Sequence, residues 1–327
     1  MLCACTADGT PAAPVQPQDV VASAEFVGAR AALFLDTGTE PRRRVTFSGA
    51  TDEIPGNSPF LPPFVDANLR ALGPLAWSPS GRSLAMVATL ALDQSQVVVT
   101  HADGSAARVA SVNTQVIVST PDWSPDEARL AYAMSTGAQA TAVDLFMTDL
   151  GANRVQRLTT GLNYAQATGT IRFGSDGRSV LYAQATGDTG SPLFDPVCEV
   201  WRLDVTNGDR VRVAQGITGT IQSVARSGSW ALVIRRLARL GAGDFDRALL
   251  RIPLVGGGPE VVLVPSGRLQ RARLTNDDLH VLFVRDESAT PGTVTNAYRI
   301  VSATGGGERA VRGTSAQTIA ADVFIPR

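Results

Sequence analysis

Short apolar runs alternate with compact polar turns along most of this chain. The runs are rich in Val, Leu, Ala and aromatic residues, and turn-forming residues bound them on both sides, as is typical of β-strands. Clear examples are "SLAMVA", "RLAYAM", "SVLYAQ", "ALVIRR" and "HVLFVR". No segment of convincing length shows the helical period of about 3.6 residues. The pattern therefore predicts an all-β protein.

One tight hairpin phrase recurs between these runs. It is clearest in residues 77–84 (WSPSGRSL) and 123–130 (WSPDEARL), and it returns in 173–180 (FGSDGRSV). Weaker copies begin at Ala225 and Arg273, so that successive copies are 46, 50, 52 and 48 residues apart. In the phrase, Pro presets a turn, Ser or Asp caps it, and Gly supplies a positive φ. Such a regular period indicates an internal repeat.

A second hairpin lies between the copies of the first. It has a strand, a turn rich in Asp, Gly and Asn, and a strand bearing Arg or Val. We find it in residues 30–46, 96–110, 144–159, 199–214, 247–263 and 296–312. The unmatched copy is at the N-terminus, and the chain ends in a lone strand-like piece, 318–326.

The two hairpins together predict a six-bladed β-propeller. Each unit of about fifty residues would form a four-stranded antiparallel sheet, and six sheets arranged radially make the propeller. The last strand of the chain would join the first strands and complete the N-terminal blade, which leaves few exposed edges. We assign residues 20–327 to this domain and residues 1–19, rich in Pro, Ala and Gln, to a flexible tail.

The phrases "WSPSGRSLA", "WSPDEARLAY" and "FGSDGRSVLY" resemble the repeats of TolB-like bacterial propellers. The resemblance covers roughly residues 20–327 and implies the propeller fold and a place in the bacterial envelope. TolB carries an α/β domain before its propeller, and in prolyl oligopeptidases similar repeats precede a hydrolase domain. Neither domain is found in this sequence, so neither activity carries over directly.

Composition and charge narrow the classes of function. The chain has 327 residues, 44% hydrophobic and 18% charged, with a formal net charge of −1. Nucleic-acid binding normally needs a basic face, so we expect no nucleic-acid partner. No apolar run approaches the roughly 18 residues of a membrane span, so we expect no transmembrane segment.

The N-terminal cysteines give an indication of where in the cell the protein is located. Leu2-Cys3-Ala4-Cys5 resembles the end of a bacterial lipoprotein signal, although the charged and apolar regions that precede such a site are missing. Either the start codon is placed too late and Cys5 is the lipidation site, or the resemblance is chance. The first alternative predicts a periplasmic protein or one anchored to the outer membrane. Cys198 has no partner in the fold region and is expected to be a buried free thiol.

The longest connections are predicted to lie on one face of the propeller, and long loops on a rigid scaffold are the default binding surface. They are residues 48–73, 184–198, 235–248 and 285–296. The candidate binding residues in them are Phe60, Phe64, Phe194, Asp195, Asp244 and Phe245. The alternative is that the phenylalanines tuck back against the blades.

Metal binding and catalysis have weaker support. Asp188, Asp195, Asp244 and Asp246 offer oxygen ligands for Ca²⁺, but the full calcium-loop pattern is absent and solvated carboxylates are the better interpretation. His101 is expected on the surface, near a turn, and His280 is expected to pack in a strand. No Gly-x-Ser-x-Gly motif is present. We therefore predict no enzyme activity and no required cofactor.

Three functions remain open. The first is a monomeric, non-catalytic protein-binding scaffold of the bacterial envelope. The alternative is a receptor for a small ligand or glycan in the central channel, with or without a metal. The third is a propeller-type lyase or hydrolase. An apolar loop face would favour the scaffold, converging carboxylates in a polar channel the receptor, and histidines with acidic residues at the channel mouth the enzyme.

Overall fold

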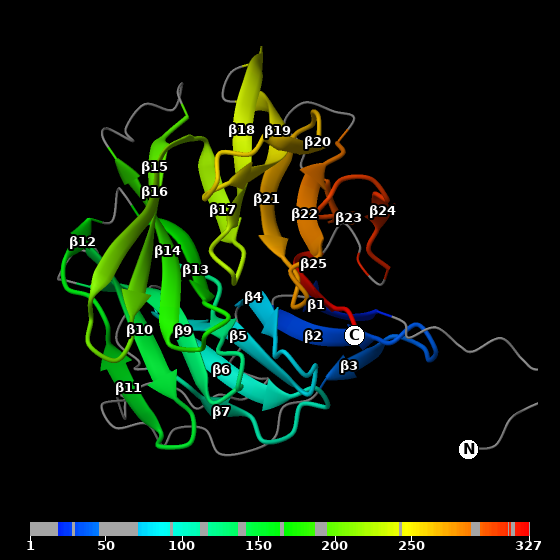
Figure 1. Cartoon of the computed structure of the whole chain (residues 1–327). Coiled ribbons are helices and arrows are strands. Elements are labelled where there is room, and N and C mark those ends of the chain that lie inside the picture. Colours follow the sequence, from blue (N-terminus) through cyan, green and yellow to red (C-terminus); the bar gives the residue numbers. More distant parts are fainter. Residues whose placement is uncertain are drawn as a thin grey trace, which may run out of the picture.

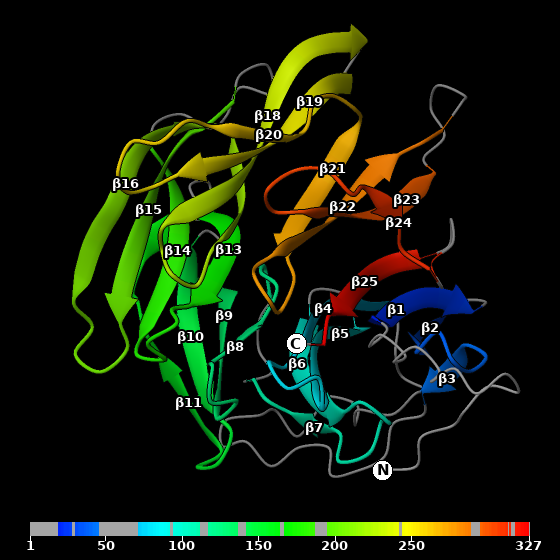
Figure 2. The same ribbon diagram turned by 45° about the vertical axis from the view of Figure 1, so that its right-hand side comes forward.

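Six β-sheets are arranged in a ring (Figures 1 and 2). Residues of several inner strands line a channel at its centre. No helix occurs in the residues that this computed structural model describes, which are 19–27, 30–45, 71–91, 94–111, 117–136, 142–163, 167–186, 195–241, 244–288, 295–312, 314 and 318–326. Each sheet has four antiparallel strands, and the third has the short β12 in addition. The predicted six-bladed propeller is confirmed.

The strands of each blade are called A to D from the channel outward. The first three blades consist of β25 (Thr318–Phe324), β1 (Val20–Val27), β2 (Arg30–Asp36) and β3 (Arg43–Val45); β4 (Ala71–Trp77), β5 (Ser83–Ala91), β6 (Gln94–His101) and β7 (Arg108–Val109); and β8 (Asp122–Trp123), β9 (Arg129–Thr136), β10 (Ala142–Asp149) and β11 (Arg154–Arg157), with β12 (Leu162–Asn163) beside β10.

The other three blades follow in chain order. They consist of β13 (Ala167–Phe173), β14 (Ser179–Thr186), β15 (Val197–Asp204) and β16 (Arg210–Thr218); β17 (Thr220–Val224), β18 (Trp230–Gly241), β19 (Asp244–Pro253) and β20 (Val261–Val264); and β21 (Leu269–Leu274), β22 (His280–Asp286), β23 (Asn296–Ser302) and β24 (Arg309–Ala310).

The first blade closes the ring as predicted. Its inner strand is β25, the last strand of the chain, which pairs with β1 from Val20↔Phe324 to Glu25↔Thr318. The ring of Phe324 lies 6.0 Å from that of Trp77 in the next blade. Gly81 has a φ of +72°, and a Cβ there would lie 2.6 Å from Phe324. Only glycine fits this turn without strain, since it needs both a positive φ and the space.

The A–B turns define the register of the repeat. In each, the residue four places after the end of the A strand has a positive φ, and these residues are Gly81, Glu127, Gly177, Gly228 and Asp278. The A strands of the fifth and sixth blades therefore end at Val224 and Leu274, where those of the second, third and fourth blades end at Trp77, Trp123 and Phe173. The predicted starts at Ala225 and Arg273 were each wrong by one residue. Val224 and Leu274 are fully buried. Because the core position at the end of each A strand must hold an apolar side chain, these residues fix the register of their copies of the repeat.

The hydrophobic core lies between the blades. One buried cluster packs Val87 and Val99 of the second blade against Trp123, Tyr132 and Phe146 of the third, and each other neighbouring pair of blades has a cluster of its own. Cys198 lies in the cluster between the fourth and fifth blades. Burial raises the pKa of its thiol to about 11. It is therefore protonated at neutral pH, as expected for a buried free thiol.

The two faces of the ring differ. The A–B and C–D turns form one face, here called the turn face, and the B–C and D–A connections form the other, the loop face. Residues 235–248 were predicted to be a loop, but β18 and β19 continue through most of this segment as a ribbon. They have 12 and 10 residues and extend past the other blades on the loop face (Figure 1). None of the described segments is a helix that could cross a membrane.

Candidate binding site in the central channel

A layer of ion pairs lies at the centre of the ring, near the turn face. It begins with the residue just before the end of the A strand, which is Asp122 in the third blade and Asp322 at the equivalent place in β25. Asp122 accepts a hydrogen bond from the Phe173 amide at 2.8 Å, and Asp322 accepts one from the Trp77 amide at 2.8 Å. Each carboxylate thus ties its own inner strand to the next blade.

Arginines complete the ion-pair layer, which we define as Asp122, Arg172, Arg226, Arg273, Asp278 and Asp322. Arg172 is 3.4 Å from Asp122 and 2.5 Å from Asp278, and Arg226 is 3.1 Å from Asp122. Arg273 is 3.0 Å from Asp322. Asp278 reaches Arg172 from a turn position with a φ of +57°, which is unusual for a residue other than glycine.

In this layer, burial and the neighbouring opposite charges shift the pKa values of the side chains in opposite directions. Burial disfavours the cation of Arg172, but the carboxylates of Asp122 and Asp278 outweigh it and raise the pKa of Arg172. For Arg226, the effect of burial outweighs that of the neighbouring carboxylates and lowers the pKa of its guanidinium. Burial also raises the pKa of Asp322, although Arg273 acts in the opposite direction. The layer joins the third, fourth, fifth, sixth and first blades through charge-assisted contacts.

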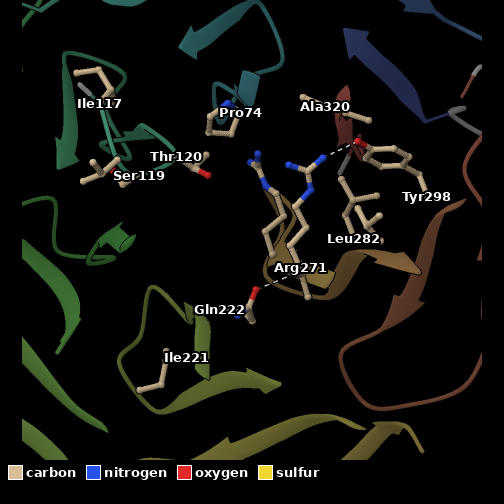
Figure 3. A pocket seen from close by; sticks show the side chains of 15 residues that line it. Pro74, Ile117, Ser119, Thr120, Ile221, Gln222, Arg271, Leu282, Tyr298 and Ala320 are labelled. Atoms are coloured by element: carbon tan, nitrogen blue, oxygen red, sulfur yellow. Dashed lines mark hydrogen bonds between the residues drawn. The ribbon is translucent and has the colours of Figure 1, made fainter. Parts of the chain in front are cut away.

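On the loop-face side of this layer lies a cavity of about 300 Å³. Five of its lining residues occupy the same register, three places before the end of the A strand or its equivalent in β25. They are Pro74, Thr120, Ile221, Arg271 and Ala320 (Figure 3). The remaining wall is largely apolar and includes Ile117, Leu282 and Val284. These five described residues therefore form a layer of mainly uncharged side chains that includes one cation.

That cation is Arg271 of β21. Its Nη2 donates a hydrogen bond to the Tyr298 hydroxyl at 2.7 Å, and its guanidinium carbon lies 5.8 Å from the centre of the tyrosine ring. Tyr298 is buried, and burial raises the pKa of its phenol, which stays protonated at neutral pH. Arg271 itself is exposed. The side chain is thus held from one side while it remains accessible from the cavity.

A second cavity, of about 340 Å³, lies nearer the loop face, and Gln222 lines both cavities. Asp195 on its wall accepts a hydrogen bond from the Arg236 amide at 2.9 Å. The Arg236 guanidinium lies 4.7 Å from the centre of the Phe245 ring. The structure therefore brings two of the predicted residues, Asp195 and Phe245, together through Arg236. Phe245 is buried beneath the arginine.

The other predicted site residues stand as follows. Phe60, Phe64, Phe194, Cys5 and the side chain of Asp244 lie outside the described residues, and so does Asp188 of the suggested calcium ligands. Asp246 accepts a hydrogen bond from the Gly267 amide at 2.6 Å. Within the described part of the chain, no three His, Cys, Asp or Glu side chains are grouped as a metal site would need.

Both histidines lie at the turn face. His280 is 2.8 Å from Asp277 in the A–B turn of the sixth blade, and His101 is exposed at the end of β6, beside Ser105. Neither is among the lining residues of the two cavities. The geometry of the described channel therefore suits binding through arginine, tyrosine and amide groups.

Sequence reasoning missed Gln222, Arg271 and Tyr298. Each has the appearance of an ordinary strand residue, and 76 positions separate the first from the last. The signal that could have found them is the repeat itself. Once the A strands are aligned at Trp77, Val224 and Leu274, residues at equal distances before these ends must face the channel in the same layer.

Solved structures have the same fold as this chain, although comparison of sequences finds no match. No protein-family model and no curated protein sequence matches the chain. TolB from Acinetobacter baumannii superimposes with a TM-score of 0.61 at 16% identity, over 93% of this chain and 66% of that chain. A chain of a nidogen/laminin complex gives 0.56 at 7% identity, over 94% and 98%. The tricorn protease gives 0.56 at 11% identity, over 93% of this chain and 30% of that chain.

These likenesses define the class of fold. The chain is a six-bladed β-propeller. It is a TolB-like propeller in its architecture, which confirms the resemblance that its repeats show. The chain spans slightly less than two thirds of the length of that TolB.

Proposed function

We propose that this chain is a non-catalytic scaffold of the bacterial envelope that binds a partner protein on its loop face. The observation that carries the proposal is the β18–β19 ribbon. It extends beyond the other blades and bears Leu237 and Leu240, which are 52% and 54% exposed. Exposed leucines at the tip of a rigid support, beside the mouth of a channel, are suited to contact a partner.

The edges of the ribbon favour side-chain contact over strand addition. On β18, the Arg236 amide donates to Asp195, and on β19 the Arg247 amide donates to the Gly267 carbonyl at 2.9 Å. These bonds occupy backbone groups that an added strand would need. The partner would therefore dock on the leucines.

Two further observations support the proposal. The TolB-like fold is consistent with a place in the envelope, and the Leu2-Cys3-Ala4-Cys5 sequence offers Cys5 as a lipid anchor. A propeller of similar length, with the same fold, comes from a protein–protein complex of nidogen and laminin. A monomeric disc with its ribbon directed away from the anchor would leave the loop face open to its partner.

The test is affinity capture from envelope and soluble fractions of the native cell, with wild type, the Leu237→Ser/Leu240→Ser double variant and Leu279→Ser. Leu279 is 66% exposed on the turn face and serves as the matched control. We expect one protein to be retained by wild type and Leu279→Ser and reduced about tenfold or more by the double variant, as for central interface residues. Equal retention by all three would contradict the loop-face proposal, and recovery of the chain only from cytosol would contradict the envelope placement.

A receptor for a small ligand or glycan in the channel is the second candidate. The cavity of about 300 Å³ favours it, because ligand sites of drug-sized molecules start at about this size. A metal-assisted version has no support in the described residues. The third candidate, a lyase or hydrolase, draws only on the fold of the tricorn protease, of which this chain spans 30%.

A further inference from the structure

The outer strand of the fourth blade differs from those of the other blades. β16 has nine residues, whereas the outer strands of the other five blades have two to four. It lies at the outer rim of the ring and, within the described part of the chain, pairs with β15 alone (Figure 2). An edge of this length offers backbone N–H and C=O groups to a further strand.

The register of β16 shows which backbone groups face outward. The Asp204 amide donates to the Asp209 carbonyl at 2.9 Å, so these two residues form a hydrogen-bonded pair where β15 and β16 meet at their turn. Hydrogen-bonded and non-hydrogen-bonded pairs alternate along an antiparallel ladder. Val211 is two places further along β16 and therefore bonds to β15, whereas the N–H and C=O groups of Arg210 and Arg212 point away from the sheet.

The side chains of these two arginines lie on one side of the sheet, over the ring of Trp201. Their guanidinium carbons are 5.8 Å (Arg210) and 5.9 Å (Arg212) from the centre of the ring. Arg212 also pairs with Glu199 at 3.4 Å, and Arg210 donates to the Tyr182 hydroxyl at 3.5 Å. Both arginines are nevertheless exposed, and stacking on the indole holds their guanidinium groups at the rim.

The side chains of β16 decide which strand fits its edge. Opposite charges on neighbouring strands attract, and like charges in the same positions repel. The same edge of a second copy would bring arginines against arginines, whereas a strand with carboxylates at two alternate positions would contact both. On the other side of the sheet, Val211 is 65% exposed, and an apolar residue between the two acids would cover it.

We propose that β16 binds an extended, acidic segment of a partner protein as a fifth strand of the fourth blade. Two carboxylates of the segment lie beside Arg210 and Arg212, and the apolar residue between them lies beside Val211. The register shift between Val200 and Trp201 ends the regular stretch after Arg212, so the docked segment is short. This surface lies on the rim of the ring and is independent of whether a partner docks on the leucines of the ribbon.

Fluorescence anisotropy with labelled synthetic peptides tests the proposal. The probe is Gly-Ser-Glu-Val-Glu-Ser-Gly, compared with a peptide that has Gln for both Glu and with one in which both Glu residues are N-methylated on the backbone. We expect wild type to bind the probe about fivefold or more tightly than the Gln peptide, because two cross-strand charge pairs are lost. The N-methylated peptide should bind about tenfold or more weakly, because it cannot donate to the edge.

Two protein variants locate the site. Arg210→Gln should bind the probe about threefold or more weakly than wild type, because one charge pair is lost. Arg43→Gln is the matched control and should bind it as wild type does, since Arg43 is an exposed arginine on β3, the outer strand of the first blade. A thermal midpoint of Arg210→Gln within a few degrees of wild type shows that its loss is local.

Three results would overturn the proposal. Equal binding of the probe and the N-methylated peptide would indicate attraction of charges without an added strand. Equal weakening by Arg210→Gln and Arg43→Gln would place the contact elsewhere, and absence of binding by the probe would show that the edge is closed to such a strand. The comparison of the peptides uses the wild-type protein alone, so it decides the question even if a variant fails to fold.

Discussion

Deletion of residues 318–327 is expected to abolish the cooperative unfolding transition of the propeller. The deletion removes β25, the inner strand of the first blade, and leaves the β1 edge without its partner from Val20 to Glu25. It also removes Ala320, Ala321 and Val323 from two inter-blade cores. The open edge and the two incomplete cores both destabilise the truncated chain. Its free energy of unfolding should therefore fall by more than about 5 kcal/mol, which is the lower end of the stability of a typical domain.

Denaturant unfolding followed by tryptophan fluorescence and circular dichroism checks this prediction. The truncated chain should show no cooperative transition, and a synthetic peptide of residues 316–327 should restore one when it is added in excess. Asp322→Ala is the milder companion variant, because it keeps the strand and loses the bonds of one carboxylate, to the Trp77 and Val323 amides and to Arg273. A truncated chain that unfolds cooperatively near the wild-type midpoint would contradict the closure of the ring by β25.

The second large effect is expected from Asp122→Ala. Asp122 binds two arginines, Arg172 at 3.4 Å and Arg226 at 3.1 Å, and its other oxygen accepts the Phe173 amide. The variant leaves these cations and a buried N–H group short of a partner. Removing one member of a buried ion pair costs about 3–5 kcal/mol, and we expect the free energy of unfolding to fall by that amount. Because Asp278 still pairs with Arg172 in the variant, we expect a loss at the lower end of this range.

Two control variants show whether the loss in the free energy of unfolding comes from the charge of Asp122. Asp122→Asn keeps an acceptor for the Phe173 amide and removes the charge, so an intermediate loss is expected. Asp209→Ala changes an exposed carboxylate of a C–D turn and should alter the free energy of unfolding by less than about 1 kcal/mol. If Asp122→Ala is no more destabilised than Asp209→Ala in equilibrium denaturation, the ion-pair layer does not join the blades.

The fold could be predicted from sequence because its information is local and repeated. The turn residues around Pro79 and Gly81 predict a hairpin by themselves, and the regular recurrence of that hairpin predicts the ring. The ribbon of β18 and β19 was predicted as a loop because Arg235, Arg236 and Arg239 break the apolar pattern of a buried strand. A strand that extends beyond its sheet has no core to bury against, so its sequence need not alternate as a core strand does.

The channel residues could not be predicted because they depend on a register that the weak repeats conceal. The fourth and fifth copies of the phrase have no Trp at the first position and no Pro in the turn. An error of one residue moves Arg271 out of the layer it shares with Pro74 and Thr120. The contact of Arg271 with Tyr298 joins different strands of one blade, and Asp122 meets Arg226 across 104 positions of sequence. Such pairings follow from the geometry of the ring and leave no local pattern.

The loop-face scaffold is tested most directly by photo-crosslinking in the native cell. A photoreactive amino acid is placed at Leu240, on the ribbon, or at Leu279, on the opposite face, which are both well exposed. The account predicts an adduct of defined mass from position 240 and none from position 279. An adduct from position 279 alone, or from neither position, would contradict a partner bound to the loop face.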